Sequence, residues 1–183
     1  EGSTGEVNLQ NGSTLSVVGS SGVIQIGSNA STTVVGSGQV NIDTFSLLSS
    51  SVGVQIGSAF SETNNQTGEV NLNNGTLQAP EVVVGTGGTL QGTGVVDATI
   101  TEISGGTVNI GSSPGVLEFT GDLELNSGLL LFEIGGNAPS SYDRIIVDGT
   151  LSATDVFGIE LRFIDGFLPS ETDIFDFIIA DTI

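Results

Sequence analysis

The sequence has no cysteine, histidine, lysine, methionine or tryptophan among its 183 residues. The absence of cysteine excludes disulfides and thiol chemistry. The absence of histidine and lysine leaves a serine without its usual general base, which argues against serine-type nucleophilic catalysis. Carboxylate pairs such as Asp122 with Glu124 are present, but alternation along a strand predicts that both point outward into solvent rather than into a cleft. We therefore predict no enzymatic activity.

Positive charge is nearly absent, because Arg144 and Arg162 are the only basic residues against 21 acidic ones, for a formal net charge of −19. Nucleic-acid binding depends on lysine and arginine side chains that neutralise phosphates, and binding to anionic lipid has the same requirement. The sequence also lacks the run of about 18 apolar residues that indicates a membrane span. We therefore predict no nucleic-acid partner, no membrane insertion, and a surface that favours cations.

What the sequence does contain is 28 glycines and many short segments in which apolar and polar residues alternate. Most apolar residues are Val, Ile or Leu and no helical period is sustained, which predicts an all-β protein. The most frequent motif, Gly-x-Val-Asn-Leu/Ile, starts at Gly5, Gly38, Gly68 and Gly106. A second motif, Ile24-Gln-Ile-Gly-Ser28, returns as Val54-Gln-Ile-Gly-Ser58.

Repetition at this spacing is typical of a β-solenoid, in which short strands stack on their copies and bury a continuous apolar ladder. Two strand motifs lie in each interval between copies of the Gly-x-Val-Asn-Leu/Ile motif. This predicts that one coil of the solenoid has roughly half as many residues as the interval, or a little more. A third motif, Gly75-Thr-Leu-Gln78, recurs from Gly88 to Gln91. A β-sandwich is the alternative fold, although it usually has longer strands and turns every 8–12 residues or so.

The asparagine of the first motif returns at the same position in every copy, at Asn8, Asn41, Asn71 and Asn109. Two interpretations fit this repetition equally well. The amides either form a ladder of side-chain hydrogen bonds or simply face water.

The composition changes near residue 117. Seven of the nine phenylalanines lie at or after Phe119, as does the only tyrosine, Tyr142. Strand-like segments also become longer and more apolar there, and Asp-Gly dipeptides separate them. We predict solenoid coils over residues 1–117 and a C-terminal, aromatic-rich β cap over residues 118–183, continuous with the coils, that closes the open strand edges.

The C-terminal half contains three segments whose order along the chain is distinctive. They are Gly106-Thr-Val-Asn-Ile-Gly-Ser-Ser-Pro-Gly-Val-Leu-Glu-Phe-Thr-Gly-Asp122, Leu131-Phe-Glu-Ile-Gly135 and Tyr142-Asp-Arg-Ile-Ile-Val-Asp-Gly149. In this order they resemble the β-helix region of bacterial autotransporter passengers, and of related surface proteins with autotransporter-associated β-strand repeats. The resemblance covers residues 86–179 or so. It implies a right-handed parallel β-helix, secreted to an extracellular or cell-surface location in a bacterium, and it carries no catalytic residues.

Calcium is the one cofactor for which the sequence offers ligands, and we predict no other. It takes six to eight oxygen ligands, often carboxylates and carbonyls in turns. Two oxygen-rich segments fit this chemistry, residues 137–143 and 165–171, with Asp143, Asp165 and Glu171 as candidate metal ligands. For Asp143 and Arg144 we also predict a local ion pair within the cap, in preference to an arginine that binds a partner's carboxylate.

These features predict a non-catalytic extracellular structural protein, a subunit or segment of a surface adhesin, sheath or filament. Self-association into a homo-oligomer or filament would occur through strand edges or head-to-tail contacts. One alternative is an adhesin passenger that binds a glycan or a host surface. That hypothesis calls for a groove with exposed aromatic side chains, yet residues 1–118 hold only Phe45 and Phe60. A polysaccharide-acting β-helix enzyme is a further alternative.

Overall fold

The computed structural model describes residues 3–20, 23–27, 36–58, 67–111 and 114–183. Within these ranges the chain is all β, as predicted, and has no helix, hence none that could cross a membrane. Thirteen strands form one sheet. The strands are β1 (Ser3–Leu9), β2 (Thr14–Val17), β3 (Ile24–Ile26), β4 (Gly36–Asp43), β5 (Leu47–Ser50), β6 (Val54–Ile56), β7 (Thr67–Gly85), β8 (Gly88–Asn109), β9 (Val116–Phe119), β10 (Asp122–Ile134), β11 (Arg144–Ala153), β12 (Phe157–Phe163) and β13 (Ile178–Thr182).

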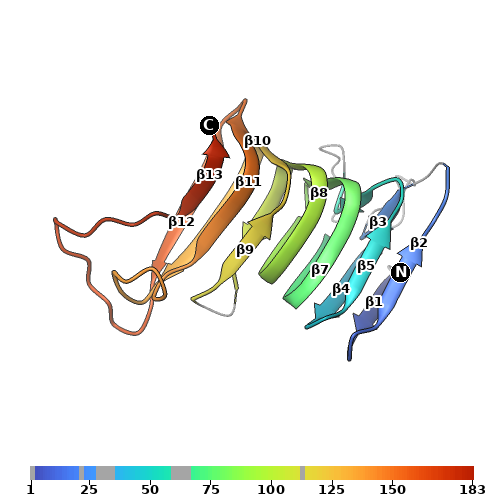
Figure 1. Cartoon of the computed structure of the whole chain (residues 1–183), viewed down its shortest axis with the longest axis horizontal. Coiled ribbons are helices and arrows are strands. Elements are labelled where there is room, and N and C mark those ends of the chain that lie inside the picture. Colours follow the sequence, from blue (N-terminus) through green and yellow to red (C-terminus); the bar gives the residue numbers. More distant parts are fainter. Residues whose placement is uncertain (1–2, 21–22, 28–35, 59–66, 112–113) are drawn as a thin grey trace.

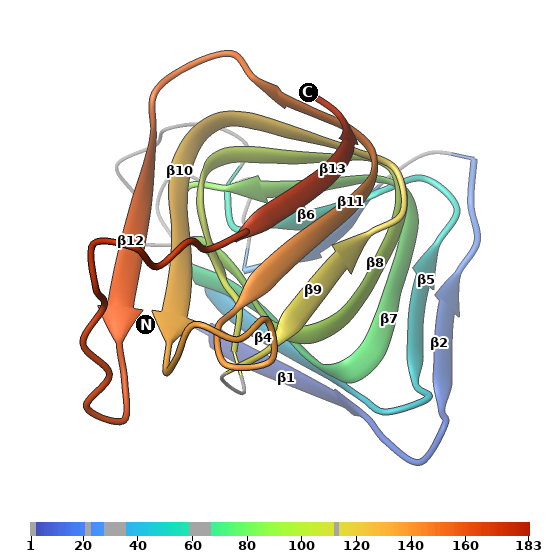
Figure 2. The ribbon, with the colours of Figure 1, turned by 60° about the vertical axis from the view of Figure 1, so that its left-hand side comes forward.

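The strands stack in three parallel columns. β1 pairs with β4, β2 with β5 and β3 with β6, and the long strand β7 then pairs with β4, β5 and β6 in turn. The chain therefore passes once through each column before it returns to the first. Each such circuit forms one level of the stack, and the levels follow one another along the longest axis of the molecule (Figure 1). Viewed closer to that axis, the columns surround a common interior (Figure 2). An antiparallel β-sandwich does not have this pairing.

The register corrects the predicted coil length. Gly5 pairs with Gly38 and Gly38 with Gly68, so each interval between these copies of the motif is one circuit through three strands, not two coils. Gly68 then pairs with Gly88, which makes the next circuit shorter. The longer interval between Gly68 and Gly106 consequently spans two circuits. The third repeated motif misleads for the same reason, because Gly75 pairs with Gly94 and lies in a different column from Gly88.

The core is the ladder of apolar side chains that point into this interior. Val40, Val70 and Leu90 follow one another in register and are buried, as are their counterparts in the other columns. Alternation along each strand places the apolar residue inside and the polar one outside. Burial of these Val, Leu and Ile side chains is the main stabilising term, at about 25 cal/mol per Å² of apolar surface.

Strand pairing continues across residue 117. β10 pairs in parallel with β8 on one side and with β12 on the other. Phe119 and Phe132 are fully buried and belong to the same core cluster as the valines of the first levels. Tyr142, Phe175 and Phe177 cluster just before β11 and β13, and Phe132, Tyr142 and Phe175 each contact Phe177.

The segment of residues 164–177, which joins β12 to β13, projects beyond the last strands at the C-terminal end (Figure 1). Its Phe167 and Phe175 pack edge to face. Leu168 and Ile174 of the same segment are almost fully exposed. The C-terminal end thus carries a projecting aromatic segment, whereas the described residues at the N-terminal end present the outer edges of β1 and β2.

Candidate functional site

The outer face of the first column carries a continuous row of amides. Asn41 Nδ2 donates to Asn8 Oδ1 at 2.6 Å, and Asn71 Nδ2 donates to Asn41 Oδ1 at 2.7 Å. Gln91 takes the next level and donates to Asn71 Oδ1, and Asn109 Nδ2 then donates to Gln91 Oε1 at 3.3 Å. Of the two interpretations of the repeated asparagine, the amide ladder is confirmed. The ladder links five successive levels.

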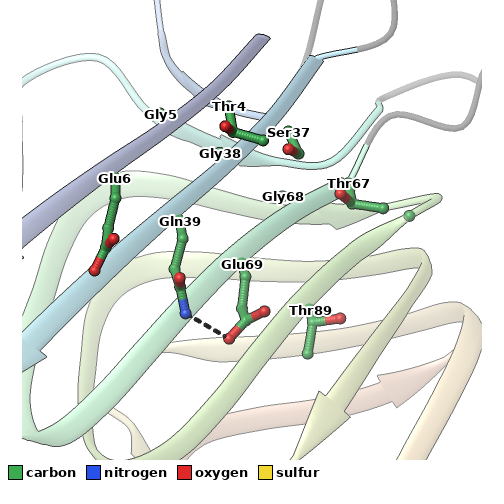
Figure 3. Close-up of a pocket in the computed structure, with 11 residues that line it drawn as sticks. Thr4, Gly5, Glu6, Ser37, Gly38, Gln39, Thr67, Gly68, Glu69 and Thr89 are labelled. Carbon is green, nitrogen blue, oxygen red and sulfur yellow. Dashed lines mark hydrogen bonds between the residues drawn. The ribbon is translucent and has the colours of Figure 1, made fainter. Parts of the chain in front are cut away.

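A second polar row lies two residues before the ladder on the same face, and it consists of Glu6, Gln39, Glu69 and Thr89 (Figure 3). Gln39 Nε2 donates to Glu69 Oε1 at 3.0 Å, and Gln91 Nε2 donates to the same oxygen at 2.9 Å. The row borders a shallow hollow of about 680 Å³. The polar atoms of both rows therefore bond largely to one another. These hydrogen bonds connect adjacent levels, and they do not position a nucleophile or a general base.

The glycine that opens the motif is required at Gly38, Gly68 and Gly106 by a close approach of backbone at the corner, whereas a Cβ on Gly5, in the first circuit, would meet nothing within 4 Å. A Cβ on Gly68 would lie 2.0 Å from the carbonyl oxygen of Ile26 and 2.5 Å from the nitrogen of Gly57. No side chain fits at that distance. The repeated glycine thus closes the corner between the third and the first column.

The predicted calcium ligands lie in different surroundings. Asp143 is fully buried, and its two carboxylate oxygens accept the backbone N–H groups of Gly115 and Glu133, each at 2.7 Å. Asp165 and Glu171 are exposed, at the two ends of a stretch within the projecting segment. Among the residues that the structure describes, no group of three or more acidic side chains could hold a metal ion. The calcium site stays a prediction.

Asp143 acts as a structural clamp. Gly115 precedes β9 and Glu133 lies in β10, so one carboxylate ties together two strands and the start of β11. Burial raises the pKa of Asp143 above its ordinary value of 3.8, against the two backbone N–H groups, which lower it. Nothing in the sequence indicates this role, because an aspartate in an Asn-Ala-Pro-Ser-Ser-Tyr-Asp segment is typical of an oxygen-rich loop.

The predicted ion pair between Asp143 and Arg144 is wrong. Both carboxylate oxygens of Asp143 bind backbone N–H groups, and the buried Nε of Arg144 has no hydrogen-bond partner among the described residues. Adjacent residues on a strand point to opposite faces, which separates the two charges. The ion pair that does form joins Arg162 Nε to Glu160 Oε1 at 2.7 Å, on the outer face of β12.

The carboxylate pair on β10 faces outward, as predicted. Asp122 Oδ1 accepts the backbone N–H of Thr150 at 2.8 Å, which ties the start of β10 to β11. Glu124 lies two residues further along the same face and is half-buried. No hydrogen bond joins these two acids, which belong to the described part of β10.

Comparisons with known proteins return nothing for this chain: no family model, no curated protein and no solved structure matches it.

The amide ladder makes a stability prediction. Asn71→Ala removes the central amide and leaves Asn41 and Gln91 each without one hydrogen bond. We expect the free energy of unfolding to fall by about 1–2 kcal/mol in urea titrations, because each lost hydrogen bond costs about 1 kcal/mol. Asn73→Ala is the control, because the Asn73 side chain is exposed and, among the described residues, its one hydrogen bond is a 3.5 Å contact with Asp43. Equal losses in the two variants would contradict a stabilising ladder.

The clamp makes a pH prediction. Because burial raises the folded-state pKa of Asp143, the proton is held more tightly in the folded chain. This tighter binding therefore stabilises the fold fully at pH values below the pKa of Asp143 in the unfolded chain. The stabilisation is lost as pH rises through the pKa of Asp143 in the folded chain. We expect the ¹³C resonance of its carboxyl group to titrate above pH 3.8, and Asp143→Asn to lose this component. A midpoint at or below that value would refute the assignment.

Calcium makes a third prediction. If Asp165 and Glu171 bind calcium, millimolar calcium should raise the melting temperature relative to chelator at fixed ionic strength, since a ligand of the folded state stabilises it. The double change Asp165→Asn with Glu171→Gln should abolish the increase. Asp148→Asn, at an exposed acid outside this segment, serves as the charge control. An unchanged melting temperature in the unmodified protein would exclude specific sites.

Proposed function

We propose that the chain is a non-catalytic structural protein of a bacterial surface, a right-handed parallel β-helix that builds an adhesin, sheath or filament by self-association at its ends. The return of the chain to the same column after each three-strand circuit supports the β-helix. Right-handedness follows from the strong preference of parallel strand connections for that hand. The aromatic cluster around Phe177 and the projecting segment form its C-terminal cap.

The observation that carries the proposal is the uncovered apolar end at β1 and β2. Val7 is 39% exposed, whereas Val40 and Val70, which follow it in register, are 6% and 0% exposed. Leu15 and Val17 of β2 are 39% and 45% exposed. Within the described ranges, no strand pairs with the outer edge of β1 or of β2. An unpaired edge beside an open apolar interior is a surface that a further strand can cover.

The other end offers a complementary edge. β12 forms the last level of the first column, and its Ile159 and Leu161 follow the buried Leu130 and Phe132 in register while remaining about half exposed. β12 runs in the same direction as β1, so a second copy can continue the column. A contact between two different ends of the same molecule is heterologous, does not close on itself, and gives filaments.

The projecting segment fits the same arrangement. Leu168 and Ile174 are apolar, almost fully exposed, and belong to the segment that projects beyond the last strands. In a head-to-tail stack they would contact the open interior of the next copy. The net charge of −19 opposes this contact at low ionic strength, so we expect association to strengthen with salt.

The test compares two variants of β2. Val17→Glu places a charge in the open interior, whereas Ser16→Glu adds the same charge one residue away on the outer face. We expect the unmodified protein to form rods whose length grows with concentration at about 0.5 M salt, where screening is strong. Val17→Glu should weaken association about tenfold or more, and Ser16→Glu should not. Sedimentation velocity and negative-stain microscopy measure both.

An unmodified protein that stays monomeric at high concentration and high salt would refute the self-association. Rods that Val17→Glu and Ser16→Glu affect equally would place the contact elsewhere than the open end.

A further inference from the structure

The turn between β4 and β5 holds an aromatic side chain in an unexpected place. Phe45 is 89% exposed and has a φ of 63°, in the left-handed region. A bulky residue that is not glycine seldom adopts this backbone conformation, because it carries a conformational cost. The exposed ring gains no burial energy to offset that cost. Phe60, the other aromatic residue of the first 118, lies outside the described residues.

The neighbouring turns show what the backbone alone would select. The turn between β1 and β2 has Asn11 at a φ of 58°, and the corresponding turn within β7 has Asn74 at a φ of 58°. Asparagine adopts the left-handed conformation at low cost, because its short polar side chain bonds locally. Phenylalanine has neither advantage. Local conformation and packing therefore leave Phe45 unexplained, and a strained exposed residue of this kind points to a role in recognition.

The surroundings of Phe45 supply the polar groups of a binding site. A hollow of about 400 Å³ at this corner is lined by Asn11, Gly12, Asp43, Thr44, Phe45 and Asn73. Within the described part of the chain the Asn11 amide makes no hydrogen bond, and the Asp43 carboxylate accepts only a 3.5 Å contact from Asn73. The hollow thus combines one aromatic face with a carboxylate and two amides whose hydrogen-bonding capacity is largely unused.

We propose that this corner binds a neutral glycan, with a sugar ring stacked on Phe45 and its hydroxyl groups bonded to Asp43, Asn11 and Asn73. A pyranose ring presents an apolar C–H face and a rim of hydroxyls, and an aromatic side chain among polar groups matches both. A protein partner would need more apolar area than one ring offers. The net charge of −19 excludes acidic glycans from the same surface.

This inference does not depend on end-to-end assembly. Phe45 lies in a turn on the side of the stack, and its level is covered on both sides by β1 and β7. A monomeric protein would bind the glycan as well as a filament does.

The experiment uses saturation-transfer NMR and calorimetry with cellohexaose, laminarihexaose and mannohexaose as neutral probes and a polygalacturonate oligomer as the acidic one. We expect the full chain to bind at least one neutral probe and not the acidic one. Phe45→Asn should weaken that binding about tenfold or more, a loss of about 1.4 kcal/mol, because it removes the ring on which the sugar stacks. Its melting temperature should stay equal or rise, because asparagine relieves the backbone strain.

Two further variants sharpen the result. Phe45→Trp keeps an aromatic face and should retain binding. Val156→Asn removes an equally exposed apolar side chain far along the sequence, with no role in the proposed end-to-end contact, and should leave binding unchanged. Failure of all neutral probes to bind the unmodified protein overturns the proposal. So does equal binding by Phe45→Asn, or a change of oligomeric state in Phe45→Asn without any glycan binding, which would make Phe45 a protein contact.

Discussion

Parallel backbone pairing in fixed register is the constraint on which the rest of this structure depends. Because Gly5, Gly38 and Gly68 face one another in successive circuits, every property of one circuit is repeated directly above it. The apolar residues therefore form a continuous core, the asparagines form a ladder of hydrogen bonds, and the glycines allow the close backbone contact at the corner. Within the described part of the chain, the same pairing leaves unpaired strand edges at both ends of the stack, which no side chain within a circuit can satisfy.

Charge in the first levels is arranged so as not to oppose this stacking, whereas Glu102 and Glu124 do face each other between β8 and β10. In the first column, acid and amide alternate along the polar row, with Gln39 between Glu6 and Glu69, so no two carboxylates of that row face each other on adjacent strands. On the second column, Gln78 Nε2 donates to Asp97 Oδ2 at 2.7 Å in the same manner. Like charges directly opposite each other would destabilise the sheet, and amides convert that repulsion into hydrogen bonds between levels.

The sequence predicts the all-β class and the repeated strand well, because alternation and repetition are local properties. Circuit length is harder, since all three columns use the same apolar–polar–apolar pattern and Gly75-Thr-Leu-Gln78 is indistinguishable from Gly88-Thr-Leu-Gln91 until their partners are known. Asp143 shows the same limit: its burial depends on Gly115 and Glu133, which are close in space but not in sequence. Phe45 stands out in the sequence only as one of few aromatic residues. Its left-handed backbone and its exposure become visible only beside the asparagines of the adjacent turns.

The amide ladder has a consequence for how such a chain can change over generations. A side chain that bonds to a copy of itself above and below finds the same neighbours wherever its circuit is inserted. Duplication or deletion of a whole circuit therefore preserves every contact of the ladder and of the core, and alters only the length of the rod. The circuits that begin at Gly5, Gly38 and Gly68 differ in the segments between strands, while the strand positions keep their register. Length and recognition can thus evolve separately: the columns set how far the molecule reaches, and the turns are free to acquire new surfaces.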